Sequence, residues 1–362
     1  MRISGSVILK ALICLLALSC GQNPRNANLS KSKPCSASPR IAKTYNSGFA
    51  LAHDTYNGIS SASDGKIYYV LCSQSIDTGG QIYSLDPKTD AVQHLGDLTE
   101  ICGEKGLKAI VQGKSHVKFV ESAGKLYFAT HIGYYSIIDG ILTMNMDTRR
   151  GVIYGLTWPT GYFFRYDLAK KEFRDLGPAM GEGESGKGAA FRVICRSLAI
   201  NPEDGSVFMT NPEGTILSSR FGQDKIEVVE GEDMRKDYFG HYDPSSSGSM
   251  GCNWRQVVWC QQEKKFYGVH GNSGYLFSFD PAIPKIEVLD RLMSKVSQRI
   301  GMFDQFSYGY PGFTLGPDGH TLYYLTGGPI YKDGKRITGK SSTSMGEAKG
   351  LENLHLITYD IA

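Results

Sequence analysis

One structural unit recurs along this chain, roughly every fifty to sixty residues. It begins with an apolar strand and a tight turn and continues into an aromatic strand, as in Asp64–Val70 and Asp318–Tyr323. A third and a shorter fourth strand follow, as in Ile82–Pro87 and Ala91–Leu95. One sheet of four antiparallel strands cannot bury both of its faces alone, so the units must stack around an axis. The repeat therefore predicts an all-β fold, the β-propeller.

The predicted inner hairpins number about six. They lie in the segments Asp64–Val70, Gly124–Phe128, Gly151–Tyr154, Asp204–Phe208, Lys265–Tyr267 and Asp318–Tyr323. Tyr127 and Tyr154, at matching positions of the second and third hairpins, are only about half a blade apart, so we expect the second blade to lack its outer strands. The last blade is expected to be incomplete as well, since only three of its strands precede Ala362. Residues Ile41–Ala50 could add a strand to it.

The N-terminal segment resembles an export signal. Arg2 and Lys10 supply positive charge, and Ala11–Leu18 is an apolar run too short to span a bilayer as a helix. Ala17-Leu18-Ser19-Cys20 resembles the lipobox of bacterial lipoproteins, in which Cys20 becomes the lipidated first residue. The alternative is an ordinary cleaved signal peptide with an incidental cysteine. Residues 1–19 are thus predicted to be a lipoprotein signal peptide, 20–46 a flexible tether and 47–362 the propeller.

These features predict a lipid-anchored protein of the cell envelope. Gly21 replaces the Asp that commonly retains lipoproteins at the inner membrane, so the outer membrane is favoured if the cell has two. A formal net charge of +3 over 362 residues does not suggest binding to nucleic acid or to a membrane surface. We therefore expect membrane contact through the N-terminal lipid only. The sequence predicts no oligomeric state.

Function is expected at the face of the propeller opposite the tight turns, because the longer connections gather there. Inner-strand ends near that face carry imidazole, guanidinium and phenol groups and little carboxylate. The candidate catalytic residues are His116, His131, Tyr134 and Arg196. The candidate substrate-binding residues are Trp158, Arg192, Arg255, His270, Tyr308 and Tyr310. Each of these side chains could instead be a satisfied structural group.

This set of residues favours an anionic carbohydrate as the ligand, because Arg pairs with carboxylate or sulfate and Trp or Tyr stacks on a sugar face. The matching reaction is β-elimination at a uronic acid. Arg would neutralise the carboxylate, one His or Tyr would remove the proton from the neighbouring carbon, and a second would protonate the leaving oxygen. The alternative is a non-catalytic propeller that binds a ligand or a protein at the cell envelope.

Other functional motifs fail on their spacing. Gly181–Gly188 is close to a phosphate-binding loop, but Gly188 stands where Ser or Thr is required and a strand follows in place of a helix. His241, Cys252, Cys260 and His270 could form a structural metal site, although their spacings match no compact zinc motif. No cofactor is predicted.

Three segments, Lys125–Tyr135, Tyr154–Gly161 and Thr326–Tyr331, resemble a group of uncharacterised bacterial envelope propeller lipoproteins. The resemblance covers most of the chain after the tether and implies the fold more than a function. More loosely, the body is similar to propeller polysaccharide lyases of the ulvan-lyase and oligogalacturonate-lyase types. That likeness implies His, Tyr and Arg in an axial cleft. A lactonase of the gluconolactonase type would hold a metal with Glu, Asn and Asp, and no clear counterpart is present.

Overall fold

The computed structural model describes residues 43–132, 140–158, 160–179, 195–236, 252–270, 275–292, 312–328, 331–332, 335–336 and 353–361. The chain divides into two compact units, Met1–Tyr45 and Asn46–Ala362. Cys20 lies outside the described residues.

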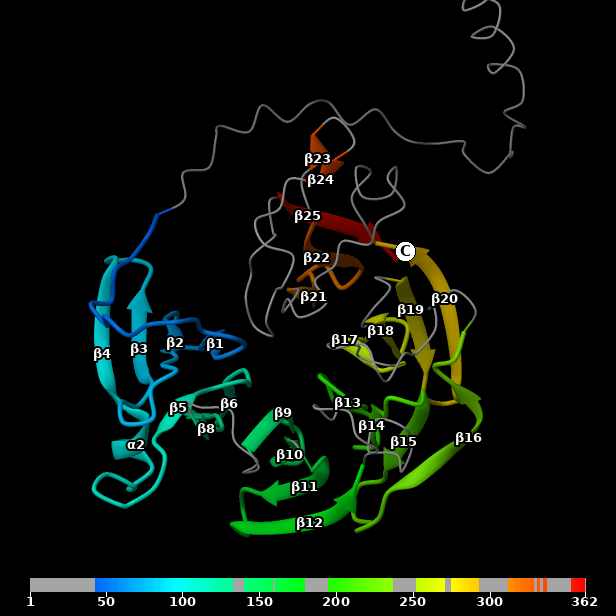
Figure 1. The fold of residues 1–362 in the computed structure, drawn as a ribbon. Coiled ribbons are helices and arrows are strands. Elements are labelled where there is room, and N and C mark those ends of the chain that lie inside the picture. The colour runs from blue at the N-terminus through cyan, green and yellow to red at the C-terminus, as the bar shows by residue number, and fades with distance from the viewer. Residues whose placement is uncertain are drawn as a thin grey trace, which may run out of the picture. The chain divides into compact units, whose positions relative to one another are not determined.

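The second unit is a β-propeller whose sheets are antiparallel throughout (Figure 1). Within the described ranges, four sheets have four strands in chain order. The first contains β1 (Ile59–Ser61), β2 (Ile67–Leu71), β3 (Gln81–Asp86) and β4 (Ala91–Asp97). The next contains β9 (Gly140–Asp147), β10 (Val152–Trp158), β11 (Tyr162–Asp167) and β12 (Glu172–Pro178). Two more contain β13 (Ala199–Ile200), β14 (Val207–Thr210), β15 (Thr215–Ser219) and β16 (Glu227–Asp233), then β17 (Trp254–Cys260), β18 (Lys265–His270), β19 (Tyr275–Asp280) and β20 (Lys285–Arg291).

The last blade has three strands, as the repeat predicted. They are β21 (Phe313–Leu315), β22 (Thr321–Gly328) and β25 (Asn353–Asp360), with a short hairpin of β23 (Tyr331–Lys332) and β24 (Lys335–Arg336) between the second and the third. In Figure 1 the first strand of each of these five sheets lies innermost and the last strand outermost. The described part of the chain therefore forms five blades.

The second predicted blade is reduced to its inner hairpin, which confirms that its outer strands are missing from the repeat. β5 (Gln112–Lys114) pairs with β8 (His131–Ile132), and β6 (Val120–Ser122) pairs with β7 (Lys125–Tyr127). A single turn of helix, α2 (Leu98–Ile101), precedes it. No helix in the described part of the chain is both long and apolar enough to cross a bilayer.

The strand expected within residues 41–50 does not form in the described part of that segment, residues 43–50. Gly48 has φ of +78° and its N–H donates to the side chain of Asn46 at 2.8 Å, so the segment turns where a strand would have to run straight. The chain joins a sheet only at Asp54, which forms an isolated antiparallel bridge with Cys72 after β2. This bridge and the hydrogen bond from Val70 N–H to the Gly58 carbonyl place residues 54–58 beside the end of β2.

Asp-Gly pairs close the tight turns between first and second strands. Asp318 accepts hydrogen bonds from the N–H groups of His320 and Thr321, at 3.1 Å and 2.9 Å, and Gly319 takes the positive φ of +79° that the turn requires. Asp64 accepts in the same way from Lys66 N–H at 3.0 Å. The turn chemistry read from the sequence thus fixes one end of the blades that carry an Asp-Gly pair, at Asp64, Asp204 and Asp318.

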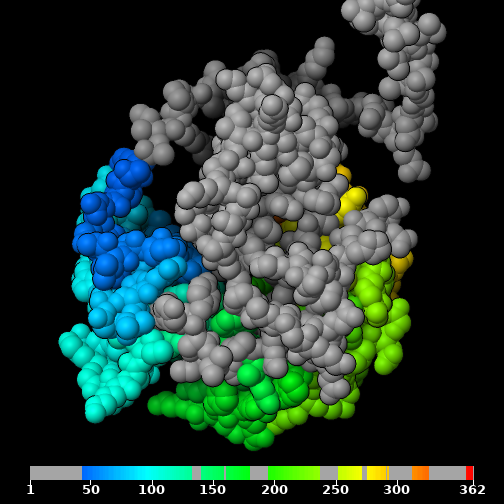
Figure 2. All heavy atoms as spheres, viewed as in Figure 1, coloured from blue at the N-terminus to red at the C-terminus, as the bar shows by residue number. Residues whose placement is uncertain are grey.

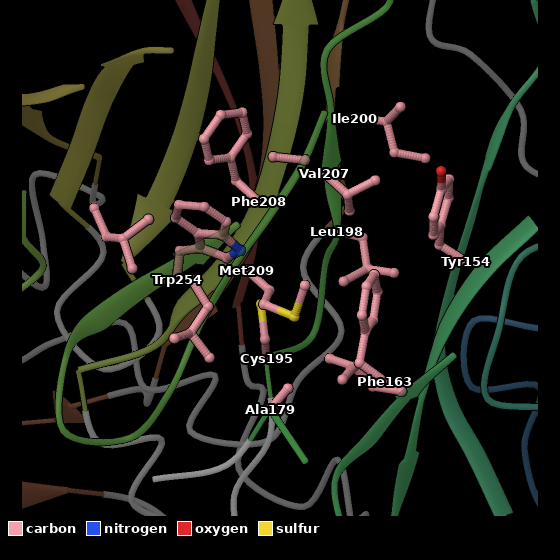
Figure 3. Close-up of a cluster of buried hydrophobic side chains, with 14 of the residues drawn as sticks. Tyr154, Phe163, Ala179, Cys195, Leu198, Ile200, Val207, Phe208, Met209 and Trp254 are labelled. Atoms are coloured by element: carbon pink, nitrogen blue, oxygen red, sulfur yellow. The ribbon is translucent and has the colours of Figure 1, made fainter. Parts of the chain in front are cut away.

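Packing between neighbouring blades forms the core (Figure 3). Trp254 at the start of β17 is fully buried, and its indole N–H donates to the carbonyl of Ser197 at 2.7 Å. Phe208 of β14 packs edge-on against Phe279 of β19, with ring centroids 5.1 Å apart. Each such aromatic side chain contributes roughly 1.5–3 kcal/mol by burial. The inner strands are therefore held firmly enough to position side chains at their ends.

Candidate functional site

His116 and His131 come together at the inner hairpin of the reduced second blade. β5 pairs with β8 so that Lys114 lies opposite His131. The two imidazole rings meet edge to face, with centroids 5.2 Å apart, and both side chains are buried. His131 Nδ1 is hydrogen-bonded to the carbonyl of Ile132 at 2.9 Å, so this nitrogen carries the proton. Both histidines were candidate catalytic residues from the sequence, and the fold brings their rings into contact.

The end of the propeller at which His131 lies follows from strand pairing. Its ring is 6.1 Å from that of Trp158, the last residue of β10, and Trp158 pairs with Gly140, the first residue of β9. Both are at the opposite end of the sheet from the turn that joins β9 to β10. In the same way His270 ends β18 and pairs with Trp254. His131, Trp158 and His270 thus occupy the loop-rich end of their blades.

Irregular pairing between inner strands is concentrated at this end. The register shifts between Gln112 and Lys114 in β5, between Leu156 and Thr157 in β10, and between Trp254 and Gln256 in β17. Bulges of this kind re-aim side chains and are frequent beside functional sites. The third of them sets the direction of the buried Arg255.

Three further residues complete the cluster around His116, and the sequence did not single them out. Lys114 has no exposed surface, and its Nζ lies 5.7 Å from the ring centroid of Tyr56. The Tyr56 ring is in turn 4.2 Å from that of His116. Asp54 lies close enough to act electrostatically on both Lys114 and Cys72. Lys114 stands two residues before His116, the spacing that puts side chains on one face of a strand, and this signal could have identified it.

The charges around His116 keep its ring neutral. Burial lowers the pKa of His116 well below its usual value, and the neighbouring His131, Arg196 and Lys114 lower it further. Burial also lowers the pKa of Lys114, against the opposing influence of Asp54 and then Cys72. A neutral imidazole flanked by two cationic side chains can accept a proton or donate a hydrogen bond. Arg196, from the segment before β13, is thus close enough to His116 to act on it electrostatically.

Polar atoms without a protein partner mark this cluster. His116 Nδ1, Arg196 Nε and Asp54 Oδ1 are all closed to solvent, and none has a hydrogen bond with the described residues. His116 itself is only 4% exposed. Buried polar atoms nearly always have a partner, and leaving one unsatisfied costs roughly 1–3 kcal/mol. Three of them in one cluster indicate a place where a ligand or an ordered water completes the hydrogen bonding.

The remaining candidates divide into two groups. Tyr134, Arg192, Tyr308, Tyr310 and His241 lie outside the described residues. Arg255 and His270 are buried in the sheet of β17–β20, and burial lowers the pKa of His270 to about 3.

The suggested metal site does not assemble from its described members. Cys252 precedes β17 and Cys260 ends it, so the seven residues of the strand separate them, roughly 20 Å of extended chain. Cys260 Sγ instead donates to the carbonyl of Gly319 at 3.5 Å. In the described ranges no three His, Cys, Asp or Glu side chains are grouped to hold a metal ion. The two thiols therefore cannot share one metal, nor can they form a disulfide.

Comparison with known proteins adds only distant structural likenesses. No protein-family model matches the chain, and no curated protein sequence does. A solved luciferin-regenerating enzyme is 10% identical with a TM-score of 0.47, over 85% of this chain and 92% of that one. A 6-phosphogluconolactonase-like protein from Bacteroides uniformis is 9% identical with a TM-score of 0.48, over 83% and 87%.

The extracellular domain of a two-component-type protein from Bacteroides thetaiotaomicron is 12% identical with a TM-score of 0.43, over 84% of this chain and 35% of that one. These similarities assign the chain to no family and identify no ligand. The propeller assignment rests on the sheet topology of the chain itself.

Proposed function

We propose that the cluster around His116 binds an anionic carbohydrate of the uronic-acid class, in a protein exported to the cell envelope and anchored there through a lipid on Cys20. The observation that carries the proposal is the pair of buried, unpartnered nitrogens, His116 Nδ1 and Arg196 Nε, beside the fully buried Lys114. A carboxylate accepts hydrogen bonds from guanidinium and ammonium groups, and a sugar hydroxyl bonds to a neutral imidazole. A uronic acid carries both groups on one ring.

The charge of the cluster favours an anion over a neutral sugar. Lys114 and Arg196 both act electrostatically on His116, and Asp54 acts on Lys114. The other oxygen of Asp54 is hydrogen-bonded to His53. A ligand carboxylate would pair with the two cationic side chains.

Binding is tested by titration calorimetry with galacturonate, glucuronate and the neutral sugar galactose. We expect both uronates to bind and galactose to bind much more weakly. Arg196→Ala should lower uronate affinity by about tenfold or more, since a hydrogen bond to a charged group contributes about 1.5–3 kcal/mol. The melting temperature should change little. Arg220→Ala, which alters an arginine with a side chain 70% exposed, is the matched control.

Two results would contradict the binding proposal. One is equal affinity for galactose and galacturonate. The other is an Arg196→Ala protein that binds uronate as tightly as the unaltered protein does.

β-Elimination at the same site is a second candidate, favoured by the two buried histidines in contact and by the neutral state of the His116 ring. One imidazole would take the proton from the carbon next to the carboxylate. The electron pair of that C–H bond would form the C=C bond as the C–O bond breaks, and the leaving oxygen would take a proton from the second imidazole. Incubation with polygalacturonate, read by the ultraviolet absorbance of the unsaturated product, separates the two candidates. Affinity without product means binding alone.

A further inference from the structure

Lys114 is the feature of this cluster that anion binding alone does not explain. A lysine that only attracts a carboxylate works at the surface, where its ammonium group stays hydrated. Here the side chain has no exposed area, and burial lowers its pKa. Desolvation of this kind is how proteins make a lysine amine nucleophilic toward carbonyl compounds.

The surroundings of Lys114 are built at a cost in backbone strain. Tyr56, whose ring is near both Lys114 Nζ and the His116 ring, has φ of +43°, a left-handed conformation that bulky residues rarely adopt. Such residues persist only where the surrounding structure holds them, and they are concentrated at functional sites. Close packing supplies that constraint, since a Cβ on Gly58 would lie 3.1 Å from the Cβ of Ser115, the residue next to Lys114.

We propose that Lys114 forms an imine with the carbonyl carbon of an open-chain sugar acid held at the His116 cluster. The inference rests on the proposed function and makes it more specific: the ligand carries an aldehyde or ketone as well as a carboxylate. The second observation that points to a ligand is the buried His116 Nδ1, which has no hydrogen bond with the described residues and whose ring contacts that of Tyr56.

The chemistry balances without an oxidant or reductant. The lone pair of the neutral amine forms the C–N bond while the C=O π bond breaks, and the carbonyl oxygen takes up a proton to give a carbinolamine. Loss of water then forms the C=N bond. The oxygen leaves with a second proton, and the amine nitrogen gives up both of its own. Asp54 Oδ1, closed to solvent and without a hydrogen bond to the described residues, is the group placed to accept a proton from the nitrogen.

The test uses the full mature protein with glyoxylate, the smallest probe that carries an aldehyde beside a carboxylate, together with cyanoborohydride to reduce any imine. Peptide mass spectrometry then locates the carboxymethyl group. We expect Lys114 to be labelled roughly ten times faster than exposed lysines, because its amine is more often unprotonated. Lys105 and Lys170, whose side chains are 71% and 68% exposed, are the internal comparison. Saturating galacturonate should protect Lys114 and leave the other two labelled.

Two variants extend the test. Lys114→Arg keeps the charge but forms no imine, so its labelling should fall to the surface background, and Lys105→Arg should leave labelling at Lys114 unchanged. If Lys114→Arg fails to fold, the positions of the carboxymethyl groups in the unaltered protein are sufficient to test the proposal.

Labelling that follows exposure, with Lys105 and Lys170 modified and Lys114 not, overturns the imine proposal. If galacturonate still binds in calorimetry, only the imine proposal has failed. If galacturonate does not bind either, the proposed function has failed with it.

Discussion

Gly140 offers a way to disturb the candidate site without altering any of its charges. It is the first residue of β9 and lies directly against the His131 ring. A Cβ added at Gly140 would lie 2.1 Å from His131 Cδ2 and 2.8 Å from its Cγ and Nε2. Ordinary contact begins at 3.4 Å, so the ring must move by about 1.3 Å, the difference between the two distances. Gly140→Ala therefore tests whether the position of His131 matters.

We expect Gly140→Ala to weaken galacturonate binding by about tenfold, the equivalent of one lost hydrogen bond of about 1.4 kcal/mol. Overpacking should also lower the free energy of unfolding by about 1–3 kcal/mol. Titration calorimetry and urea denaturation measure the two effects separately. Gly312→Ala is the matched control, because among the described residues its added methyl group would meet the Cβ of Leu325 alone, at an ordinary 3.5 Å. Because both variants replace Gly by Ala, the substitution restricts the unfolded chain equally in each, and this effect cancels in the comparison.

The outcome that would refute this reasoning is a Gly140→Ala protein that is less stable but binds galacturonate as well as the unaltered protein does. The His131 ring would then have moved without consequence, and His131 would have no part in the site.

Three further predictions concern stability, thiol reactivity and localisation. Because burial lowers the folded-state pKa of His116 and His270 below the unfolded value of about 6.5, the unfolded chain binds more protons, and stability should fall as the pH drops from about 6.5 to 5. For each histidine the free energy of unfolding should change by up to about 1.4 kcal/mol per pH unit. Urea denaturation at three pH values measures this slope. A free energy of unfolding that stays constant over that range would contradict the burial of both rings. Maleimide should modify the exposed Cys102 in the native protein. It should modify the buried Cys72, whose thiol pKa is raised by burial, only after unfolding. Rapid labelling of Cys72 in the native protein would contradict its burial. Replacing Cys20 by Ser should move the protein from the membrane to the soluble fraction, and unchanged fractionation would rule out the lipid anchor.

The fold could be predicted from the sequence because its signals are local. An Asp-Gly turn such as Asp318-Gly319 fixes its hairpin from within a few residues. The short distance from Tyr127 to Tyr154 likewise leaves no room for two outer strands. The described part of that interval contains β8 of the inner hairpin and β9, the first strand of the next blade. The strand expected in residues 41–50 was wrong because the turn at Asn46–Gly48 outweighs the benefit of pairing.

The site was predictable only in part, because its contacts join segments distant in sequence. His131 lies in β8, and His116 follows β5, the strand that pairs with β8, by two residues, so the two histidines belong to one local unit of the chain. Tyr56 precedes the first strand of a different blade, and its role depends on the contact between that blade and the next. Lys114 was missed because a lysine in a strand is usually exposed, and periodicity alone does not tell which face of a strand is closed to solvent.

The most direct test of the central claim is a crystal structure of the protein with bound galacturonate. The account predicts the carboxylate within hydrogen-bonding distance of Arg196 Nε and a sugar oxygen within hydrogen-bonding distance of His116 Nδ1, the two buried atoms that lack a partner among the described residues. Galacturonate bound elsewhere, with only an ordered water at His116 Nδ1, would contradict it.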